Sequence, residues 1–401
     1  MNYSNDLSHQ NKPKPKAVIV GGSIAGVSCA HALILAGWDV VVIEKSCRPP
    51  KGNPTGAGLA FDPLSQELIG SWTGRPELLH DITSPLAIDL NQAIDDEKSI
   101  KILARDENFN HRAAHWSSLH HHLFSALPPE IFLWGHLFLS FSISKDKRQV
   151  KIRAQVLDTE ETAEVDGDLL VAADGCNSLI RKHYFPDVKL RYSGYCGWRG
   201  VLDYSGIEDS KTIKNVREAY PELGKCLYID LTPGNHTGNS VTMKVSDEMI
   251  QKMYQDAEKI WHPTLVQVMR ETKEPFVNAI YDCDPLERIV WDNVVLIGDA
   301  AHPTTPHSSR STNMSILDAA VLGQCLEKWG SENLMAALEE YQSIRLPIAS
   351  KQVLHARRVG RIKQGLELPD CKSFNPNTAN WEECKMLLQR AVPFFGHNPL
   401  L

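Results

Sequence analysis

The chain has 401 residues, 42% of them apolar and 23% charged, with a formal net charge of −7. This composition is ordinary for a globular protein, and the acidic balance argues against a general nucleic-acid binder, which carries a basic surplus. The nine cysteines form no CxxC pair, which favours reduced thiols in the cytoplasm over a disulfide framework. The longest apolar stretch, 131–143, is too short to span a bilayer, so we expect no membrane association.

The first ordered segment predicts a strand, a glycine-rich turn, a helix and a second strand. Ala17–Val20 is a short apolar run, Gly21–Gly26 follows it, and Val27–Ala36 has an apolar helical pattern. Asp39–Ile43 is a second apolar run that ends directly at Glu44. This order is typical of a Rossmann-like βαβ unit that binds a dinucleotide.

Each part of this unit has a physical task. The first glycine permits the tight turn, small residues let helix amides approach the pyrophosphate, and Glu44 accepts hydrogen bonds from the adenosine ribose. Ser23 stands where the G-x-G-x-x-G pattern has its middle glycine, which is a small departure. The residues expected to contact the dinucleotide here are Gly21, Gly22, Ser23, Ile24, Ala25, Gly26, Glu44 and Lys45.

Two later segments have the same strand-then-turn form. The apolar run 168–173 ends in Asp174-Gly175, followed by Ser178 and Arg181. The run 294–297 ends in Gly298-Asp299, and a helical pattern follows over about 312–329.

With these three fingerprints in this order, the chain resembles the single-component FAD-dependent aromatic hydroxylases, also called class A flavoprotein monooxygenases. The likeness extends over roughly 16–361 and is closest to the 2,6-dihydroxypyridine hydroxylase branch. The segments that carry the closer likeness are Gly21-Gly22-Ser23, Thr55-Gly56-Ala57-Gly58, Tyr192-Ser193-Gly194-Tyr195, Trp198-Arg199-Gly200 and Pro306-His307.

The resemblance implies a role for several further residues. Asp299 would bind the ribityl hydroxyls of FAD, and the helix after it, beginning near Thr312 and Asn313, would direct its positive end at the flavin ring. Pro306 would start the loop along the reactive edge of the ring. The resemblance places Asp174 near the pyrophosphate, with Arg181, and has Arg112 reach the cofactor from a neighbouring helix.

The resemblance also implies the chemistry. NADH or NADPH would dock transiently and reduce the flavin, which would react with O2 to form a C4a-hydroperoxide that hydroxylates a small aromatic or heteroaromatic substrate. A base must lie within hydrogen-bond reach of the substrate hydroxyl, and our candidates are Tyr195 and His307, with Asp62 a weaker third.

Two departures from the family pattern stand out. The loop after Pro306 carries Ser308-Ser309-Arg310 where the family has glycines, and a serine adopts the left-handed conformation at a cost of about 1 kcal/mol. The aromatic strand that this branch carries between Trp198 and Pro285 has no visible counterpart, and 232–239 is rich in turn residues instead. We therefore expect a shortened substrate domain.

The expected fold is α/β, with a Rossmann-like FAD-binding domain on a parallel sheet and a smaller substrate domain on an antiparallel sheet. We expect a disordered leader over 1–15 and the FAD-binding domain over 16–190, with part of the substrate sheet inserted near 80–110. The substrate domain would follow over 191–285, and 286–401 would hold the Gly298-Asp299 segment and C-terminal helices. Strand patterns at 87–90, 150–156 and 195–202 suit the antiparallel sheet, and 244–270 and 334–361 are helical in pattern.

Other interpretations stay open. The same scaffold could serve a different FAD-dependent oxidoreductase, such as an epoxidase or reductase, which a wholly apolar pocket would favour. A degenerate FAD-binding protein with impaired turnover is the second alternative. The histidines at 111, 115 and 120–122 lack acidic or cysteine partners at metal-ligand spacing, so we expect no metal. A homodimer is compatible with the sequence but is not indicated by it.

Overall fold

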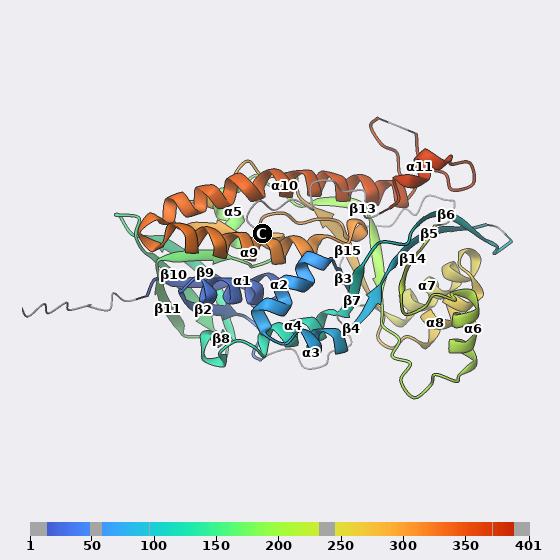
Figure 1. Ribbon diagram of the computed structural model, residues 1–401, viewed down its shortest axis with the longest axis horizontal. Helices are drawn as coiled ribbons and strands as arrows, with labels where there is room; N and C mark the ends of the chain where they lie inside the picture. Colours follow the sequence, from blue (N-terminus) through green and yellow to red (C-terminus); the bar gives the residue numbers. More distant parts are fainter. Residues whose placement is uncertain (1–13, 49–57, 96, 232–244, 371, 389–401) are drawn as a thin grey trace, which may run out of the picture.

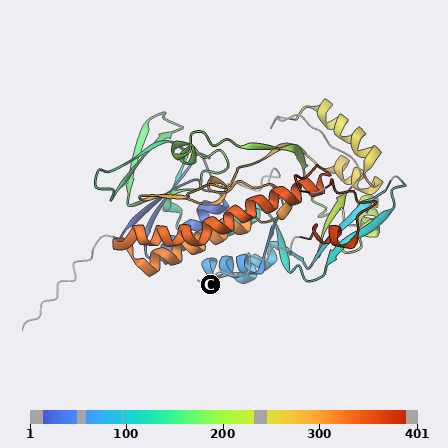
Figure 2. The same cartoon turned by 90° about the horizontal axis from the view of Figure 1, so that it is seen from above.

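The computed structural model describes residues 14–48, 58–95, 97–231, 245–370 and 372–388. The molecule is elongated, with a large lobe built on the parallel sheet and a smaller lobe around β5, β6 and β14 (Figure 1). The long helix α10 (Leu334–Lys363) runs along both lobes, as the view from above also shows (Figure 2).

The central sheet has six strands in the order β16-β17-β12-β1-β2-β8. All neighbours are parallel except β16 and β17, which are antiparallel. The sheet strands are β1 (Lys16–Val20), β2 (Asp39–Glu44), β8 (Phe132–Trp134), β12 (Leu169–Ala172), β16 (Val290–Trp291) and β17 (Val294–Leu296). Three of them, β1, β12 and β17, end at the predicted Gly21, Asp174 and Gly298 turns, which therefore meet at one edge of the sheet.

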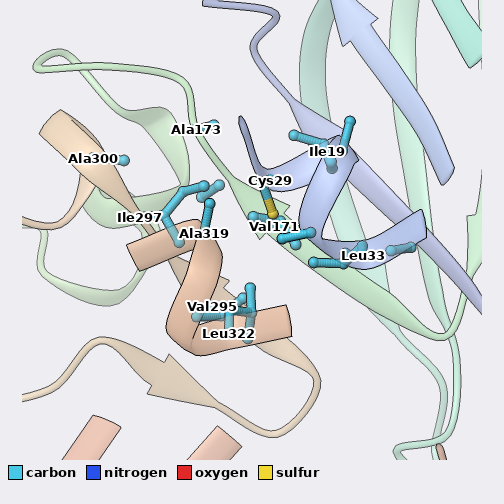
Figure 3. Close-up of a cluster of buried hydrophobic side chains, with 14 of the residues drawn as sticks. Ile19, Cys29, Leu33, Val171, Ala173, Val295, Ile297, Ala300, Ala319 and Leu322 are labelled. Carbon is cyan, nitrogen blue, oxygen red and sulfur yellow. The ribbon is translucent and has the colours of Figure 1, made fainter. Parts of the chain in front are cut away.

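The main core lies between this sheet and the helices α1 (Ile24–Leu35) and α9 (Ser311–Trp329). Figure 3 shows side chains of the sheet, such as Ile19 and Val171, packed toward Leu33 of α1 and Leu322 of α9. The two helices cross so closely that a Cβ at Gly323 would lie only 2.9 Å from the Cβ of Ala32. Burying this apolar surface is the dominant favourable term in the folding of the large lobe.

The expected α/β fold with a parallel sheet and separate antiparallel strands is confirmed, but the predicted antiparallel strands do not form one sheet. The three strand patterns fall in three separate sheets, because each strand pairs with its own neighbours, and β14 pairs with β5 in parallel. The sheets are β11-β10-β9 (Thr162–Gly167, Val150–Val156, His136–Ile143), β14-β5-β6 (Cys226–Leu231, Ile88–Ile94, Ile100–Asp106), β13-β15 (Arg191–Arg199, Phe276–Asp282) and β3-β7-β4 (Gly58–Phe61, His111–His115, Thr83–Leu86).

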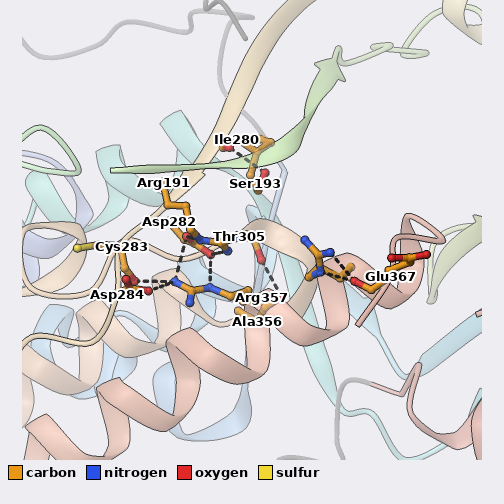
Figure 4. A network of polar contacts seen from close by, with 11 residues as sticks. Arg191, Ser193, Ile280, Asp282, Cys283, Asp284, Thr305, Ala356, Arg357 and Glu367 are labelled. Atoms are coloured by element: carbon orange, nitrogen blue, oxygen red, sulfur yellow. Dashed lines mark hydrogen bonds and ion pairs between the residues drawn. The ribbon is translucent and has the colours of Figure 1, made fainter. Parts of the chain in front are cut away.

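The two-stranded ribbon β13–β15 is fastened to α10 by a buried carboxylate (Figure 4). Asp282 is fully buried and accepts hydrogen bonds from Arg191 Nε at 3.0 Å and Arg357 Nε at 2.9 Å. Arg357 Nη2 also lies 2.8 Å from Asp284 Oδ1. A buried charge with several charge-assisted partners fixes orientation more than it adds stability.

The helical patterns are confirmed with changed boundaries. The 244–270 pattern is split at Trp261–His262 into α7 (Asp247–Ile260) and α8 (Pro263–Glu271), while 334–361 is a single helix that continues through Pro347. The remaining helices are α2 (Pro63–Thr73), α3 (Pro76–Asp81), α4 (Trp116–Phe124), α5 (Leu179–Tyr184), α6 (Lys211–Ala219), α11 (Trp381–Lys385) and the short 3-10 turns at Pro129–Ile131, Gly298–Ala300, Pro306–Ser308 and Ser331–Asn333.

Some predictions fall on residues outside the described ranges. They are the leader up to residue 13, the 55–57 part of the glycine turn, and the turn-rich patch at 232–239. Among the residues that the structure describes, no helix is long and apolar enough to cross a membrane.

Candidate FAD and substrate site

Two adjoining cavities lie at the edge of the sheet where β1, β12 and β17 end. The larger has a volume of about 660 Å³ and the smaller about 440 Å³. Ser23, Trp116, Ala173 and Gly175 line both, so the two cavities form one extended site. Their sizes are those of small-molecule or cofactor pockets.

The glycine-rich turn is shaped by contacts that exclude side chains. Gly21 has φ +105°, and a Cβ there would lie 2.3 Å from Ala173 O. A Cβ at Gly26 would lie 1.9 Å from Gly21 O, so the turn closes only with glycine at both positions. Of the predicted dinucleotide contacts, Gly21, Gly22, Ser23, Glu44 and Lys45 line the smaller cavity, Ser23, Ile24 and Ala25 line the larger, and Gly26 lines neither.

Glu44 closes the base of the smaller cavity. Its Oε2 accepts a hydrogen bond from Gly22 N at 2.7 Å, and its Oε1 accepts from Ser46 N and Ser46 Oγ, both at 2.8 Å. His120 Nε2 lies 2.7 Å from Gly22 O on the other side of the turn. The turn is thus held by side chains from β2 and α4, with Glu44 facing the cavity as the sequence predicts.

The Asp174 turn carries an acceptor atom that the described residues leave unused. Asp174 Oδ2 accepts from Leu179 N at 2.9 Å, whereas the buried Oδ1 has no hydrogen-bond partner in the described part of the chain. Burial raises the pKa of this carboxyl. Arg181 donates to Asp299 O at 3.0 Å and Ala300 O at 2.9 Å and so joins the two turns, and its position near the pyrophosphate stays a prediction.

Asp299 lines the larger cavity, and its side chain and the preceding residue are held by hydrogen bonds from or to α9. Its Oδ1 accepts from Ser311 Oγ at 2.8 Å. The preceding Gly298 N donates to Asp318 Oδ2 at 2.8 Å, and the same carboxylate accepts from His302 and Arg345. Although burial alone would raise the pKa of Asp318, His302 and Arg345 hold that pKa below its usual value.

The loop after Pro306 adopts the left-handed backbone without a glycine. Ser309 has φ +52°, and its carbonyl accepts from Asn313 Nδ2 at 2.9 Å. Asn313 Oδ1 also accepts from Asp62 N at 2.8 Å, which joins the loop to the start of α2. Pro306 and Thr312 line the larger cavity, and their contact with the cofactor stays a prediction, whereas Asn313 is fully buried and holds the loop.

The predicted position of Arg112 differs from the structure. The residue lies on strand β7 and not on a helix, because 111–115 pairs with β3 and β4. Its guanidinium donates to Thr83 Oγ1 at 2.5 Å and to Thr83 O at 2.9 Å. Arg112 is not among the residues that line either cavity. Its contact with the cofactor stays a prediction.

Tyr195 and His307 are brought together, although neither lines the larger cavity. A bulge in β13 between Tyr192 and Cys196 turns Tyr195 inward, and its ring centre lies 5.2 Å from that of His307. Burial raises the pKa of Tyr195 to about 12, and burial with the charges of Lys363 and Arg199 lowers the pKa of His307 to about 3. Asp62, the third candidate base, is bound to Arg310 instead.

Several cavity residues were not identified from sequence. Phe276, Asn278 and Tyr281 of β15 line the larger cavity, and Trp134 and Phe138 line the smaller. The signal for β15 was present in the run Phe-Val-Asn-Ala-Ile-Tyr-Asp, which has strand composition, but it does not match the family's aromatic strand. In the described residues, no cluster of three or more His, Cys, Asp or Glu side chains suits a metal ion.

The residues present fit FAD. The tight turn at Gly21 brings the start of α1 to the cavity, and α1 and α9 both begin at the cavity edge with their amide groups available to anions. The unused Asp174 Oδ1 and the cavity-lining Asp299 supply acceptors for hydroxyl groups.

Comparison with known proteins decides the family. A family model described as an FAD binding domain matches residues 134–356, more than half of the chain. The chain belongs to the FAD-dependent aromatic hydroxylase family. It is an FAD-dependent monooxygenase, and FAD is its cofactor.

Individual relatives are distant, and their alignments extend over half of the chain or more. The chain is 26% identical to 3-amino-4-hydroxybenzoate 2-monooxygenase of Streptomyces cremeus over 88% of each chain. It is 32% identical to aurachin C monooxygenase/isomerase of Stigmatella aurantiaca over half of this chain and 53% of that protein. The structure of 2,6-dihydroxypyridine-3-hydroxylase from Arthrobacter nicotinovorans shares the fold, with a TM-score of 0.70, 20% identity, and coverage of 90% of this chain and 96% of that one.

Proposed function

We propose that the protein hydroxylates a small aromatic or heteroaromatic compound that carries a ring hydroxyl, with O2 as oxidant and NADH or NADPH as electron donor. The observation that carries the proposal is the wall that the β13–β15 ribbon gives to the larger cavity. Phe276 and Tyr281 are aromatic residues that line this wall, and Asn278 and Arg199 are polar residues that line it. A flat ring with polar substituents suits such a wall.

The same wall argues against the first alternative. An epoxidase or reductase of a lipid-like substrate is expected to have a wholly apolar pocket. Here Arg199, Asn278, Asp299 and Arg310 all line the cavity. The polar groups favour a small hydroxylated ring over a lipid chain.

Bound FAD supplies two-electron redox chemistry and activates O2 for transfer of one oxygen atom to the substrate. The protein's residues hold and orient the reactants. We assign proton handling to Tyr195 and His307, whose pKa values of about 12 and about 3 keep the hydroxyl protonated and the imidazole neutral at pH 7. Because neither side chain lines the larger cavity, we propose that Tyr195 as donor and His307 as acceptor reach the substrate hydroxyl through a bridging water.

We also propose that the protein is located in the cytoplasm. The eight cysteines within the described ranges are all free thiols, which supports a reducing compartment such as the cytoplasm. A homodimer stays a prediction that no observation here favours.

The test is oxygen incorporation. FAD-loaded protein is incubated with NADH or NADPH, ¹⁸O2 and a panel of hydroxylated pyridines, benzoates and phenols. The masses of the products are then measured by mass spectrometry. The proposal expects one added ¹⁸O atom for at least one ring compound. It also expects Arg199→Gln to raise the KM for that compound about tenfold, with Arg105→Gln on β6 as a control without effect. Oxidation of the donor with no labelled product for any compound would support the degenerate alternative.

A further inference from the structure

A buried ion pair forms part of the wall of the larger cavity. Arg310 Nη1 lies 2.9 Å from Asp62 Oδ2, and the two side chains are only 6% and 8% exposed. Arg310 lines the cavity, whereas Asp62 does not. Asp62 Oδ1 instead accepts from Ser65 N at 2.8 Å, as the N-cap of α2. The pair is therefore oriented, with its cation on the cavity side and its carboxylate on the α2 side.

The pair is held in place by its neighbours. Asn313 Oδ1 accepts from Asp62 N at 2.8 Å and from Ser65 Oγ at 3.0 Å. Gln352 Nε2 of α10 donates to Ser308 Oγ at 2.9 Å, which fixes the loop from the other side. Charges that are fixed before a reaction stabilise developing charge more effectively than charges that must reorganise.

Of the titratable groups near Arg310, the bonded Asp62 carboxylate opposes its charge, whereas two histidines do not add to it. His111 and His355 both face it, and burial is the main cause that lowers the pKa of each, to about 4 for His111. Both imidazoles are therefore neutral at pH 7, and Asp62 is the carboxylate bonded to Arg310. The family resemblance implies glycines at this point of the loop, so the cation is a departure of this chain.

We infer that Arg310 tunes the reduction of the cofactor. Its guanidinium, together with the positive end of α9, stabilises the negative charge that bound FAD gains on reduction. Arg310 is the residue before the first turn of α9, and the helix N-terminus alone carries about half a positive charge. The guanidinium acts in the same direction, and because the Asp62 carboxylate lies on the side away from the cavity, it offsets only part of this effect. The inference rests on FAD binding in this cavity and not on the proposed substrate.

Two single substitutions test the inference because they remove opposite charges. Arg310→Gln removes the cation and leaves Asp62, whereas Asp62→Asn removes the anion and keeps a side chain able to cap α2. The midpoint potential of the bound flavin is measured anaerobically against reference dyes, without substrate. We expect Arg310→Gln to lower the potential and Asp62→Asn to raise it. Each change should alter the ratio of reduced to oxidised flavin about tenfold, which is about 30 mV for a two-electron couple.

Two further variants serve as controls. Arg310→Lys keeps the charge and should restore most of the potential that Arg310→Gln loses. Arg357→Gln removes a half-buried arginine that does not line the cavity, and it should destabilise the protein without moving the potential. A purely structural role predicts shifts of the same sign in Arg310→Gln and Asp62→Asn. Shifts of the same sign, or an unchanged potential in Asp62→Asn, would overturn the inference even if Arg310→Gln retains no flavin.

Discussion

The turn at Gly21–Gly26 and the loop at Pro306–Asn313 line the same site, but they obtain their shapes in different ways. The turn has glycines where the backbone needs positive φ or close approach, at Gly21 and Gly26. The loop reaches a left-handed conformation at Ser309, a residue that disfavours it. Its shape comes from partners far away in sequence, since Asn313 bonds to Asp62 and Ala60.

The difference shows what local sequence can and cannot specify. Glycines determine the turn through their own conformational freedom, so the turn is visible in the sequence. The loop is determined by tertiary hydrogen bonds, each worth about 1 kcal/mol net, which offset a local cost of the same size. We therefore expect substitutions in the turn to cause steric clashes with large effects. Substitutions near the loop should have smaller effects, through changes in buried charge or in backbone strain.

The largest effect is expected for Gly26→Ala. The added Cβ would lie 1.9 Å from Gly21 O, so the turn must open. We expect about 3 kcal/mol of destabilisation and loss of most bound FAD, measured by denaturant unfolding and by the flavin absorbance of purified protein. Gly37→Ala is the matched control: it strains a residue with φ +84° but has open space around its Cβ. Equal loss of FAD in both variants would contradict the steric account.

A smaller effect is expected for Asp299→Ala, which removes an acceptor from the wall shared by turn and loop. Hydrogen bonds to a charged group contribute about 1.5–3 kcal/mol, so the Kd for FAD should rise about 10- to 100-fold. Titration of the apoprotein with FAD, followed by fluorescence, measures this. Asp292→Asn, which alters an exposed ion pair with Lys147, should leave the Kd unchanged. An unchanged Kd in Asp299→Ala would remove this residue from the cofactor site.

Lys363 provides a test of buried charge beside the loop. Burial lowers its pKa from 10.5 to about 8, with Asp89 acting in the opposite direction, and Lys363 itself acts on His307 and His355. Below pH 8 Lys363 is protonated in both the folded and the unfolded chain, so folding bears the full cost of burying the charged ammonium group. Between pH 8 and 10.5 only the unfolded chain keeps the proton, so the contribution of Lys363 to the free energy of unfolding rises with pH.

Lys363→Met should therefore stabilise the protein by about 2 kcal/mol at pH 7, and the gain should shrink as the pH rises through 8 to 10.5. Denaturant unfolding at several pH values measures both. Lys147→Met, at an exposed lysine, should show no such dependence. A gain that does not vary with pH would mean that packing, and not charge, is responsible.

The smallest effect is expected for Ser309→Gly. Glycine tolerates φ +52° without strain, so the folded state should gain, although the unfolded chain gains freedom as well. We expect a net change within about 1 kcal/mol, on the stabilising side, with unchanged FAD content. Asn313→Ala, which removes the bond to Ser309 O, should destabilise the wild type more than it destabilises the Ser309→Gly variant. Equal costs in both backgrounds would show that the bond does not support the strained serine.

Much of the cofactor region could be predicted from sequence because its signals are local. The three strand-then-turn segments gave the positions of Gly21, Asp174 and Asp299 at one sheet edge, and Glu44 follows its strand directly. Side-chain directions in irregular segments could not be predicted in the same way. Arg112 turns toward Thr83 because of strand pairing.

The substrate region was the least predictable. Tyr195 is directed by a bulge in β13 at Gly194, whose φ is +96°, and the glycine marks a bulge in the strand but not the direction of Tyr195, which lies beside His307 without lining the cavity. The wall residues Phe276 and Tyr281 come from β15, which pairs with β13 across some eighty residues of chain, and such pairings are not encoded locally.

We propose that this site holds FAD and a hydroxylated ring side by side. The most direct test of this proposal is anaerobic reduction of the bound flavin by NADH and NADPH in a stopped-flow instrument, with and without each ring compound. We predict that at least one hydroxylated aromatic or heteroaromatic compound accelerates flavin bleaching strongly. Bound flavin that neither donor reduces faster in the presence of any compound would contradict the account.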